Sequence, residues 1–314
     1  MSPSPNADPP RVLVLGSINM DLVVQCRSLP RPGETVLAES STEVCGGKGA
    51  NQAVAAARAG GRTAMIGRIG GDSFAERLRR NLEQELIQCE HILATPQSAS
   101  GLAVVAVDQR GENSIIVVPG ANAQVSANDV RSIGDMIGDY DVMLTQLETP
   151  VETAVQAIGI ARAAGVRVIV DPAPAPSSCP NELLSVDLVC PNETEAATLS
   201  GQPVESIDQA ESAAKIILQR GARAVAVTMG ENGTLLCTGE KSTHVPSLPV
   251  TVRDTTAAGD AFAGALAVRW AESCDLEGSI PFASAAGALA ASKAGAQPSL
   301  PHREEIDRFL SSQT

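Results

Sequence analysis

Residues 252–264 read V-R-D-T-T-A-A-G-D-A-F-A-G and predict a loop that runs into the start of a helix. The turn-forming residues end at Ala257-Ala258-Gly259, and Asp260 opens a run of small and apolar residues at helical spacing. A helix start presents unpaired backbone N–H groups and the positive end of the helix dipole. Small residues at this point leave the backbone open to an approaching anion.

Two interpretations of this stretch remain open from these residues alone. An anion-binding backbone with a carboxylate beside it is the equipment for transferring a phosphoryl group to a hydroxyl. Alternatively, Asp260 only caps a helix. The rest of the chain has to distinguish them.

The composition indicates one large α/β domain. The 314 residues can bury roughly three quarters of the extended surface, and aromatic residues make up only 2% of them. Such a core of small apolar residues suits helices packed on a parallel sheet. The formal net charge of −13 argues against nucleic acid as a partner. No apolar run reaches the ~20 residues that span a bilayer, which argues against a membrane protein.

The cysteines and histidines exclude several other classes. Seven cysteines are scattered without a C-x-x-C pair, which favours a reducing, cytoplasmic setting over a disulfide framework or a zinc cluster. Three histidines far apart in sequence offer little to a His-based metal site or a Ser-His-Asp triad. Residues 1–10 are polar and Pro-rich and are interpreted as a disordered leader, not a signal peptide. Residues 11–314 are expected to form a single domain.

The first predicted strand, residues 11–16 (R-V-L-V-L-G), is a continuous apolar run typical of a strand buried on both faces. Asn19 and Asp21 follow its carboxyl end, where ligands bind in parallel α/β sheets. Ordinary turn chemistry is the alternative for both residues. No second glycine follows in G-x-G-x-x-G register, which weighs against a dinucleotide-binding dehydrogenase.

Residues 45–60 predict a glycine turn followed by a helix that begins at Asn51 and stops at Gly60. Lys48 is followed by glycine, so the segment does not fit the P-loop pattern G-x-x-x-x-G-K-[ST]. Lys48 and Asn51 could instead offer donors to a polyhydroxylated ligand. The alternative is a Gly-rich connection that only packs against the helix.

Strands and helices alternate from residue 63 onward, and two strand-rich segments interrupt this rhythm. The alternation predicts a doubly wound, mostly parallel sheet with helices on both faces. Segments 17–45 and 101–122 are expected to form a small β lid, the second as a hairpin around Q-R-G-E-N. Such a lid could close over a substrate and exclude water. Further helices are expected at 128–137, 151–164, 207–220, 260–272, 276–293 and near 303–310, and strands at 63–69, 141–147, 167–171, 187–190 and 222–228.

Three polar features follow predicted strands, and each has two interpretations. Glu148 could reach a ligand or lie in the first turn of a helix. Asn192 and Glu195 fit a capping box, or an amide that contacts a nucleotide together with a carboxylate that contacts Mg²⁺ through water. The turn at 228–233 could contact phosphates through its backbone, although an isolated G-x-x-G is weak evidence.

Taken together, these segments resemble the ribokinase/PfkB family of carbohydrate kinases, and its ribokinases in particular. The resemblance runs from about residue 12 to residue 310. It rests on seven motifs in order: G-S-I-N-M-D (16–21), G-G-K-G-A-N-Q-A (46–53), Q-L-E-T-P (146–150), P-N-E-T-E-A (191–196), T-M-G-E-N-G (228–233), D-T-T-A-A-G-D-A-F-A-G (254–264) and K-A-G-A-Q-P-S (293–299).

The resemblance implies a role for each matching position. Asp260 is implied as the base, with the backbone of Ala257, Ala258 and Gly259 as the anion hole. The implied sugar-binding residues are Asn19, Asp21, Gly47, Lys48, Asn51, Glu148 and Asp260. The implied nucleotide-binding residues are Asn192, Thr228, Gly230, Gly233, Gly259 and Ser284. Glu195 is implied at Mg²⁺, and a potassium site is implied at Asp254, Thr256, Ala290, Lys293, Gly295 and Ser299.

The implied activity is ATP-dependent phosphorylation of D-ribose at the 5-hydroxyl, with Mg²⁺ required, K⁺ stimulating, and a homodimer formed through the lid. Some positions depart from the family pattern. Ala257 replaces a glycine of the common D-T-x-G-A-G-D, Asp171 stands where ribokinases often carry Asn, and Ser284 replaces a larger polar residue near the adenine. A carboxylate at a helix start is also expected to be a weak base, because the dipole favours its charged form.

Two other functions remain open from the sequence. The first is another kinase of this family, acting on deoxyribose, fructose, a ketodeoxy sugar acid or a nucleoside; the scarcity of aromatic residues argues against a nucleoside. The second is a non-catalytic sugar-binding or regulatory protein on a kinase fold, which the presence of Asp260 and Gly259 disfavours.

Overall fold

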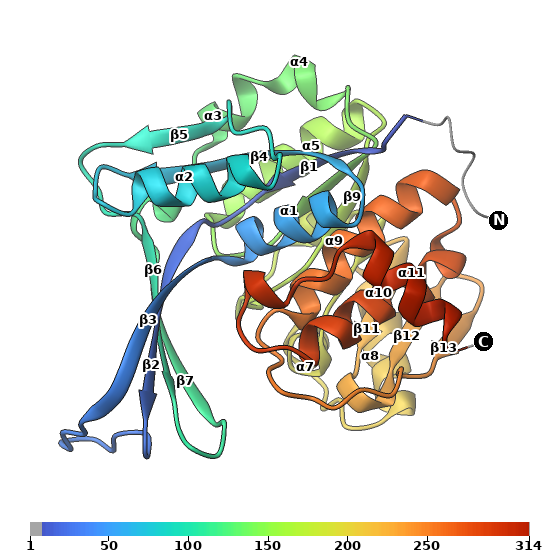
Figure 1. Cartoon of the computed structure of the whole chain (residues 1–314). Coiled ribbons are helices and arrows are strands. Elements are labelled where there is room, and N and C mark those ends of the chain that lie inside the picture. The colour runs from blue at the N-terminus through green and yellow to red at the C-terminus, as the bar shows by residue number, and fades with distance from the viewer. Residues whose placement is uncertain (1–7, 314) are drawn as a thin grey trace.

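A nine-stranded sheet forms the centre of the structure (Figure 1). Its strands lie in the order β13-β12-β11-β10-β9-β8-β1-β4-β5. This computed structural model describes residues 8–313, so most of the predicted leader at 1–10 lies outside the described residues. The strands from β11 to β5 pair in parallel, and β12 and β13 pair antiparallel. The strands are β1 (Arg11–Leu15), β4 (Arg62–Gly70), β5 (Ile92–Thr95), β8 (Val142–Thr145), β9 (Arg167–Val170), β10 (Leu188–Val189), β11 (Ala224–Thr228), β12 (Thr234–Thr238) and β13 (Ser242–Val245).

Helices cover both faces of this sheet, which confirms the predicted doubly wound fold. Side chains of β1 alternate between two cores: Val12 and Val14 face one, and Leu13 and Leu15 face the other. The first core is covered by α1 (Lys48–Arg58), α2 (Ala75–Gln84), α9 (Ala258–Ser273), α10 (Leu276–Ala291) and α11 (Arg303–Ser311). The second is covered by α3 (Ala127–Arg131), α4 (Gly134–Ile137), α5 (Val151–Ala163), α6 (Asn181–Leu184), α7 (Glu193–Ser200) and α8 (Ile207–Gln219).

A second, four-stranded sheet extends away from the larger one (Figure 1). Its strands are β2 (Asn19–Cys26), β3 (Ala38–Gly46), β6 (Gly101–Val107) and β7 (Asn113–Val118), in the order β3-β2-β6-β7. The predicted hairpin is present as the antiparallel pair β6–β7. β2 and β6 run parallel, and this pairing joins the two strand-rich segments into one small sheet.

Several element boundaries differ from those predicted. Helix α1 begins at Lys48 and α9 at Ala258, three and two residues before the predicted starts at 51 and 260. The helix predicted at 128–137 is two short helices, because Ile133 leaves helical geometry (φ −118°, ψ 14°). Strands β5, β12 and β13 were not predicted; each has only four or five residues.

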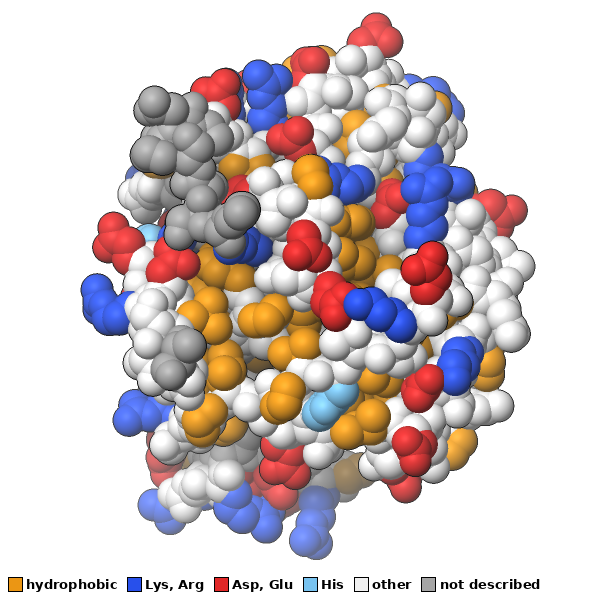
Figure 2. Space-filling model, turned by 90° about the vertical axis from the view of Figure 1, so that its right-hand side faces the viewer, with side chains coloured by type: hydrophobic (Ala, Val, Ile, Leu, Met, Phe, Trp, Pro, Cys, Tyr) orange, Lys and Arg blue, Asp and Glu red, His pale blue; other side chains and the backbone are white. Residues whose placement is uncertain are grey.

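The face of the molecule shown in Figure 2 carries side chains of both charges. On this face, Lys and Arg side chains are interspersed with Asp and Glu side chains, and hydrophobic side chains show between them. Among the helices described for residues 8–313, none combines the length and apolarity needed to cross a membrane.

The crossing of α1 and α9 generates a stability prediction. A Cβ at Gly264 would lie 2.6 Å from the Cβ of Ala55 and 2.7 Å from the carbonyl oxygen of Gln52. We therefore expect Gly264→Ala to lower the free energy of unfolding by about 1–3 kcal/mol through overpacking, measured by urea unfolding.

The matched control is Gly159→Ala in α5, where a Cβ would meet nothing within 4 Å. Alanine at an open helix position should stabilise the protein by about 0.5–1 kcal/mol. A Gly264→Ala protein as stable as the wild type would show that α1 and α9 do not pack this closely.

Candidate active site

The α1–α9 crossing brings a carboxylate against two amides. Asp260 lies in the first turn of α9 and is 3% exposed. Asn51 Nδ2 donates to its Oδ2 at 2.9 Å, and Gln52 Nε2 donates to its Oδ1 at 3.1 Å. The two predicted residues Asn51 and Asp260 thus meet, although they are more than 200 residues apart in sequence. The Asp260 side chain does not cap its own helix, because α9 has no side-chain cap.

Glycine is required where the chain turns from β3 into α1. Gly47 has φ 91°, and a Cβ there would lie 2.7 Å from the backbone nitrogen of Asn19. A Cβ at Gly49 would lie 2.6 Å from the backbone of both Gly16 and Ser17. This close approach packs the start of α1 against the segment that leaves β1. The predicted glycine turn is therefore shorter than expected, and Lys48 lies in the first turn of the helix.

Glu148 lies in the connection between β8 and α5, so its placement in a first helical turn is wrong. Its Oε2 accepts a hydrogen bond from Ser17 Oγ at 2.6 Å and a weaker one from the backbone nitrogen of Lys48 at 3.4 Å. The carboxylate therefore sits at the positive end of α1, where it is stabilised by the helix dipole.

Asn19 and Asp21 lie on β2 and pair with β3 and β6, so the turn interpretation is wrong for both. Being two residues apart, they point to the same face of the strand. Asn122 Nδ2 donates to Asn19 Oδ1 at 2.7 Å. Asp21 Oδ1 and Asn51 Oδ1 are buried without a hydrogen-bond partner. Unpaired buried acceptors are costly, so these two are suited to the hydroxyl groups of a ligand.

Lys48 lies amid several carboxylates. Burial alone would lower the pKa of Lys48, but the charges of Asp260, Asp171, Glu148 and Glu195 together raise it above its ordinary value. The ammonium group therefore stays protonated and offers a fixed positive charge. This one positive charge therefore interacts with carboxylates from several parts of the chain, including α7 and α9.

Asp21 and Asp260 hold their protons more tightly than an ordinary carboxyl does. Burial, followed by the charges of Glu148 and Asp260, raises the pKa of Asp21 to about 7. Burial raises the pKa of Asp260 to about 6 although Lys48, Asn51 and Gln52 oppose it. The expectation that Asp260 is a weak base is therefore wrong, because the loss of water outweighs the helix dipole.

Asn192 and Glu195 form the predicted capping box at the start of α7. Asn192 Oδ1 accepts from the backbone nitrogen of Glu195 at 2.8 Å, and Glu195 Oε2 accepts from that of Asn192 at 2.9 Å. Burial raises the pKa of Glu195, although the hydrogen bond from Asn192 and the charge of Lys48 oppose it. Capping occupies Oε2 and leaves Oε1 for another contact.

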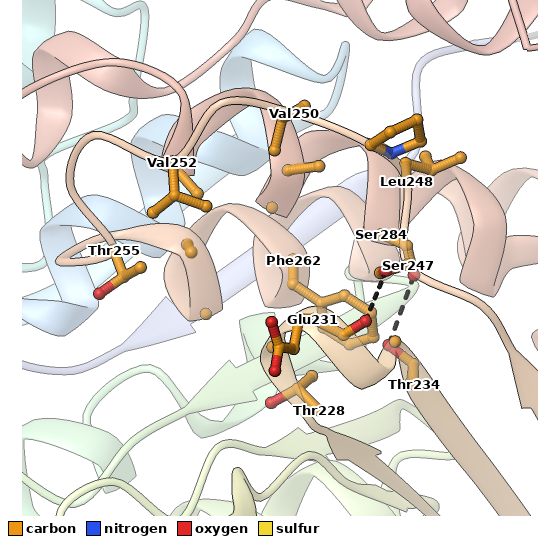
Figure 3. Close-up of a pocket in the computed structure, with 18 residues that line it drawn as sticks. Thr228, Glu231, Thr234, Ser247, Leu248, Val250, Val252, Thr255, Phe262 and Ser284 are labelled. Atoms are coloured by element: carbon orange, nitrogen blue, oxygen red, sulfur yellow. Dashed lines mark hydrogen bonds between the residues drawn. The ribbon is translucent and has the colours of Figure 1, made fainter.

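A cavity of about 490 Å³ opens beside the start of α9 (Figure 3). Five of the predicted nucleotide-binding residues line it: Thr228, Gly230, Gly233, Gly259 and Ser284. Asn192 does not line it, but pairs with Thr228 in a single parallel bridge. Ala258 also lines the cavity, and its backbone nitrogen donates to the carbonyl oxygen of Thr255 at 3.1 Å.

One wall of this cavity was not predicted. It consists of residues 247–250 with Val252, and Phe262 of α9 lies across from it (Figure 3). Ser247 is held in place by donating to the carbonyl oxygen of Glu231 at 2.6 Å. The only signal in the sequence was an apolar, Pro-containing stretch outside any predicted element.

The segment before α9 packs against the end of α10 and the loop that follows. Asp254 accepts from the backbone nitrogens of Thr256 at 3.0 Å and Gly295 at 2.9 Å. The ammonium group of Lys293 is paired with Glu305 at 2.7 Å. Within residues 8–313, no three His, Cys, Asp or Glu side chains are grouped to hold a metal ion.

The site therefore combines a buried carboxylate, two unpaired acceptors and a cavity beside the start of α9. Asp260 lies next to Gly259, which lines the cavity. A buried carboxylate and a helix start beside one cavity suit the transfer of a phosphoryl group to a hydroxyl.

Comparisons with known proteins identify the family. The model of the pfkB family of carbohydrate kinases matches residues 9–303. The chain is 40% identical to a ribokinase of Haemophilus influenzae over 298 residues, covering 95% of this chain and 97% of that protein. It is 35% identical to a deoxyribokinase of Salmonella typhimurium over 301 residues, covering 96% and 98%. An Arabidopsis thaliana ribokinase, solved with ribose and ATP, is 33% identical and superposes with a TM-score of 0.87 over 97% of this chain and 99% of that one.

The chain belongs to the pfkB family of carbohydrate kinases. The sequence-based resemblance is thereby confirmed, and the non-catalytic alternative loses its support.

The raised pKa of Asp21 predicts a pH-dependent gain in stability when this carboxyl is removed. In the folded protein Asp21 ionises near pH 7 rather than near its ordinary 3.8. Its contribution to stability is therefore full below pH 3.8 and is lost as the pH rises to about 7. We expect Asp21→Asn to raise the melting temperature relative to wild type by several degrees at pH 8 and by less than half as much at pH 5.

The control is Asp139→Asn, which changes an exposed carboxyl and should leave the melting temperature within a degree at both pH values. An equal effect of Asp21→Asn at pH 5 and pH 8 would contradict the burial of this charge.

Proposed function

We propose that this protein phosphorylates D-ribose at the 5-hydroxyl with ATP. One observation carries the proposal: Asp260 is buried beside Asn51 at the helix start that also borders the cavity. The relatives named ribokinase support ribose as the sugar. The sugar would contact Asp21, Asn51 and Lys48, and the nucleotide would occupy the cavity.

The chemistry follows from these positions. Asp260 accepts the proton of the 5-hydroxyl, whose oxygen forms a bond to the γ-phosphorus as the bond to the bridging oxygen of ADP breaks. The backbone at Gly259 donates to the transferring group, and a base with a pKa of about 6 is ionised at neutral pH yet still able to accept a proton. The small sheet would close over the sugar as a lid and exclude water.

Mg²⁺ and K⁺ are proposed as cofactors. Glu195 would contact hydrated Mg²⁺ through Oε1, and the ion would neutralise phosphate charge. K⁺ would bind oxygen atoms of the loop that Asp254 holds together. The donors would be Asp254, the backbone of Thr256, Ala290, Lys293 and Gly295, and Ser299. The hydrogen bond from Gly295 to Asp254 fits such a site, because it brings the two backbone segments side by side. Bound K⁺ would then set the geometry of residues 257–259 without touching either substrate.

The test is ADP release in the presence of Mg²⁺ with ribose, 2-deoxyribose, fructose and a ketodeoxy sugar acid, each with K⁺, with Na⁺ and without either. We expect the highest kcat/KM with ribose and a rise of several-fold with K⁺. Asp260→Asn should lower kcat by about 10³-fold or more with ribose KM within 3-fold, since the base acts mainly in the transition state.

A different result would contradict each part of the proposal: the sugar, the base and the potassium site. A higher kcat/KM with 2-deoxyribose would make the protein a deoxyribokinase, the second candidate, which the 35% identical Salmonella relative favours. Near-wild-type kcat in Asp260→Asn would remove its role as the base. Equal rates in all three salt conditions would remove the potassium site.

We also propose that the small sheet forms a homodimer contact. β7 exposes Ile115, Ile116, Val117 and Val118, each by more than 40%, and such an edge strand is a pairing surface. Light scattering should give twice the 32.3 kDa chain mass for the wild type and for Leu86→Asp, which changes an exposed residue outside the sheet. Ile116→Asp should give the single-chain mass. A wild-type monomer at micromolar concentration would contradict the dimer.

A further inference from the structure

One buried amide joins two carboxylates in a way that the proposed reaction does not by itself explain. Gln52 is fully buried in α1, and its Nε2 donates to Asp171 Oδ2 at 2.6 Å and to Asp260 Oδ1 at 3.1 Å. An amide nitrogen carries two hydrogens, so each carboxylate takes one. Asp171, which lies just after β9, is therefore connected to the base through a single side chain.

The Gln52 amide is also held from its other end. Gln146, buried after β8, donates through Nε2 to Gln52 Oε1. The nitrogen of Gln52 faces Asp171 and Asp260 while its oxygen faces Gln146. A carboxyl oxygen can accept from this nitrogen whether or not the other oxygen carries a proton. The orientation of this amide is thus set by three partners from three elements.

The backbone around Asp171 is equally fixed. Its nitrogen donates to the carbonyl oxygen of Thr145 at 2.9 Å, and Leu147 donates to Ala173 at 3.0 Å. These bonds join the ends of β8 and β9 beyond the strands themselves. Asp171 is thereby a rigid anchor for Gln52, and it does not border the nucleotide cavity.

We propose that Asp171 and Gln52 are positioning residues for phosphoryl transfer: Asp171 holds the Gln52 amide, and Gln52 holds one oxygen of Asp260 so that this carboxylate keeps a single orientation. Asn51 holds the other oxygen. Fixing a base to within a fraction of an ångström contributes to rate rather than to affinity. The proposal rests on the kinase activity proposed above.

The first test is a double-mutant cycle on kcat, with sugar KM and melting temperature measured alongside. Asp171→Leu should lower kcat about 10-fold and Gln52→Leu about 30-fold, each with sugar KM within 2-fold. In the Gln52→Leu background, adding Asp171→Leu should change kcat by less than 2-fold, because Asp171 acts on Asp260 through Gln52. Asp171→Asn keeps an oxygen that accepts from Gln52 and should stay within 3-fold of wild type.

The matched control is Asp187→Leu. Asp187 accepts from the backbone nitrogen of Val168 at 2.9 Å and from Arg223 at 2.7 Å, at the opposite end of β9 and β10. Its loss should affect the melting temperature but leave kcat per folded molecule unchanged. Additive effects of Asp171→Leu and Gln52→Leu, or wild-type kcat in Asp171→Leu, would overturn the proposal.

The second test does not depend on activity: titration of the Asp260 carboxyl carbon by NMR in the protein without substrates. Hydrogen bonding by Gln52 lowers the pKa of Asp260, so Gln52→Leu should raise it above the wild-type value of about 6. Asp171→Leu frees Gln52 to bond Asp260 alone, so it should lower that pKa. The other charged groups facing the pair are unchanged in both variants: Lys48, Glu148, Glu195 and Asp21.

The outcomes separate this proposal from the function on which it rests. Shifts in opposite directions support the connection through Gln52 even if no tested sugar is phosphorylated. Unchanged titration of Asp260 in both variants overturns the connection even if ribose proves to be the substrate.

Discussion

The close crossing of α1 and α9 is the contact on which the rest of the site depends. Gly264 lets the two helices approach until the backbone of Gln52 and Ala56 lies where a larger side chain would stand. At this separation the consecutive amides of Asn51 and Gln52 reach both oxygens of Asp260. A close-packed interior transmits small displacements instead of absorbing them, so the orientation of the Asp260 carboxylate is set by helix packing. The start of α1 is fixed by a second close approach, in which Gly47 packs against the backbone of Asn19.

Burial raises the pKa values of carboxyl groups in the site and also lowers the stability of the folded protein. Several carboxylates share the neighbourhood of one lysine, and removal from water raises the pKa of Asp21 and Asp260. A folded protein gains little from such charges and loses stability by keeping them ionised. The unpaired oxygens of Asp21 and Asn51 add to this cost. Both features suit a site whose polar groups are completed by a hydroxylated ligand, and they illustrate how activity can be favoured over stability.

Much of the fold could be predicted from local sequence, whereas the details of the site could not. The apolar run of β1, the hairpin at 101–122 and the glycine turn before α1 carry strong local signals. The four-residue strand β13 and the cavity wall at 247–250 depend on contacts made after folding. Spacing alone left Asn192 and Glu195 open between a cap and a ligand site, and the structure shows the cap. The basicity of Asp260 was misjudged because it depends on burial, and Gln52 was overlooked because its partners lie in distant elements.

In the proposed reaction, the sugar and the nucleotide meet at the first turn of α9, with Asp260 between them and the small sheet above. The most direct measurement is a crystal structure with ribose and a non-hydrolysable ATP analogue. We expect the ribose 5-hydroxyl within hydrogen-bond distance of the Asp260 carboxylate and facing the γ-phosphate, with the sugar also in contact with Asp21 and Asn51. Ribose bound elsewhere, or with its 5-hydroxyl turned away from Asp260, would contradict it.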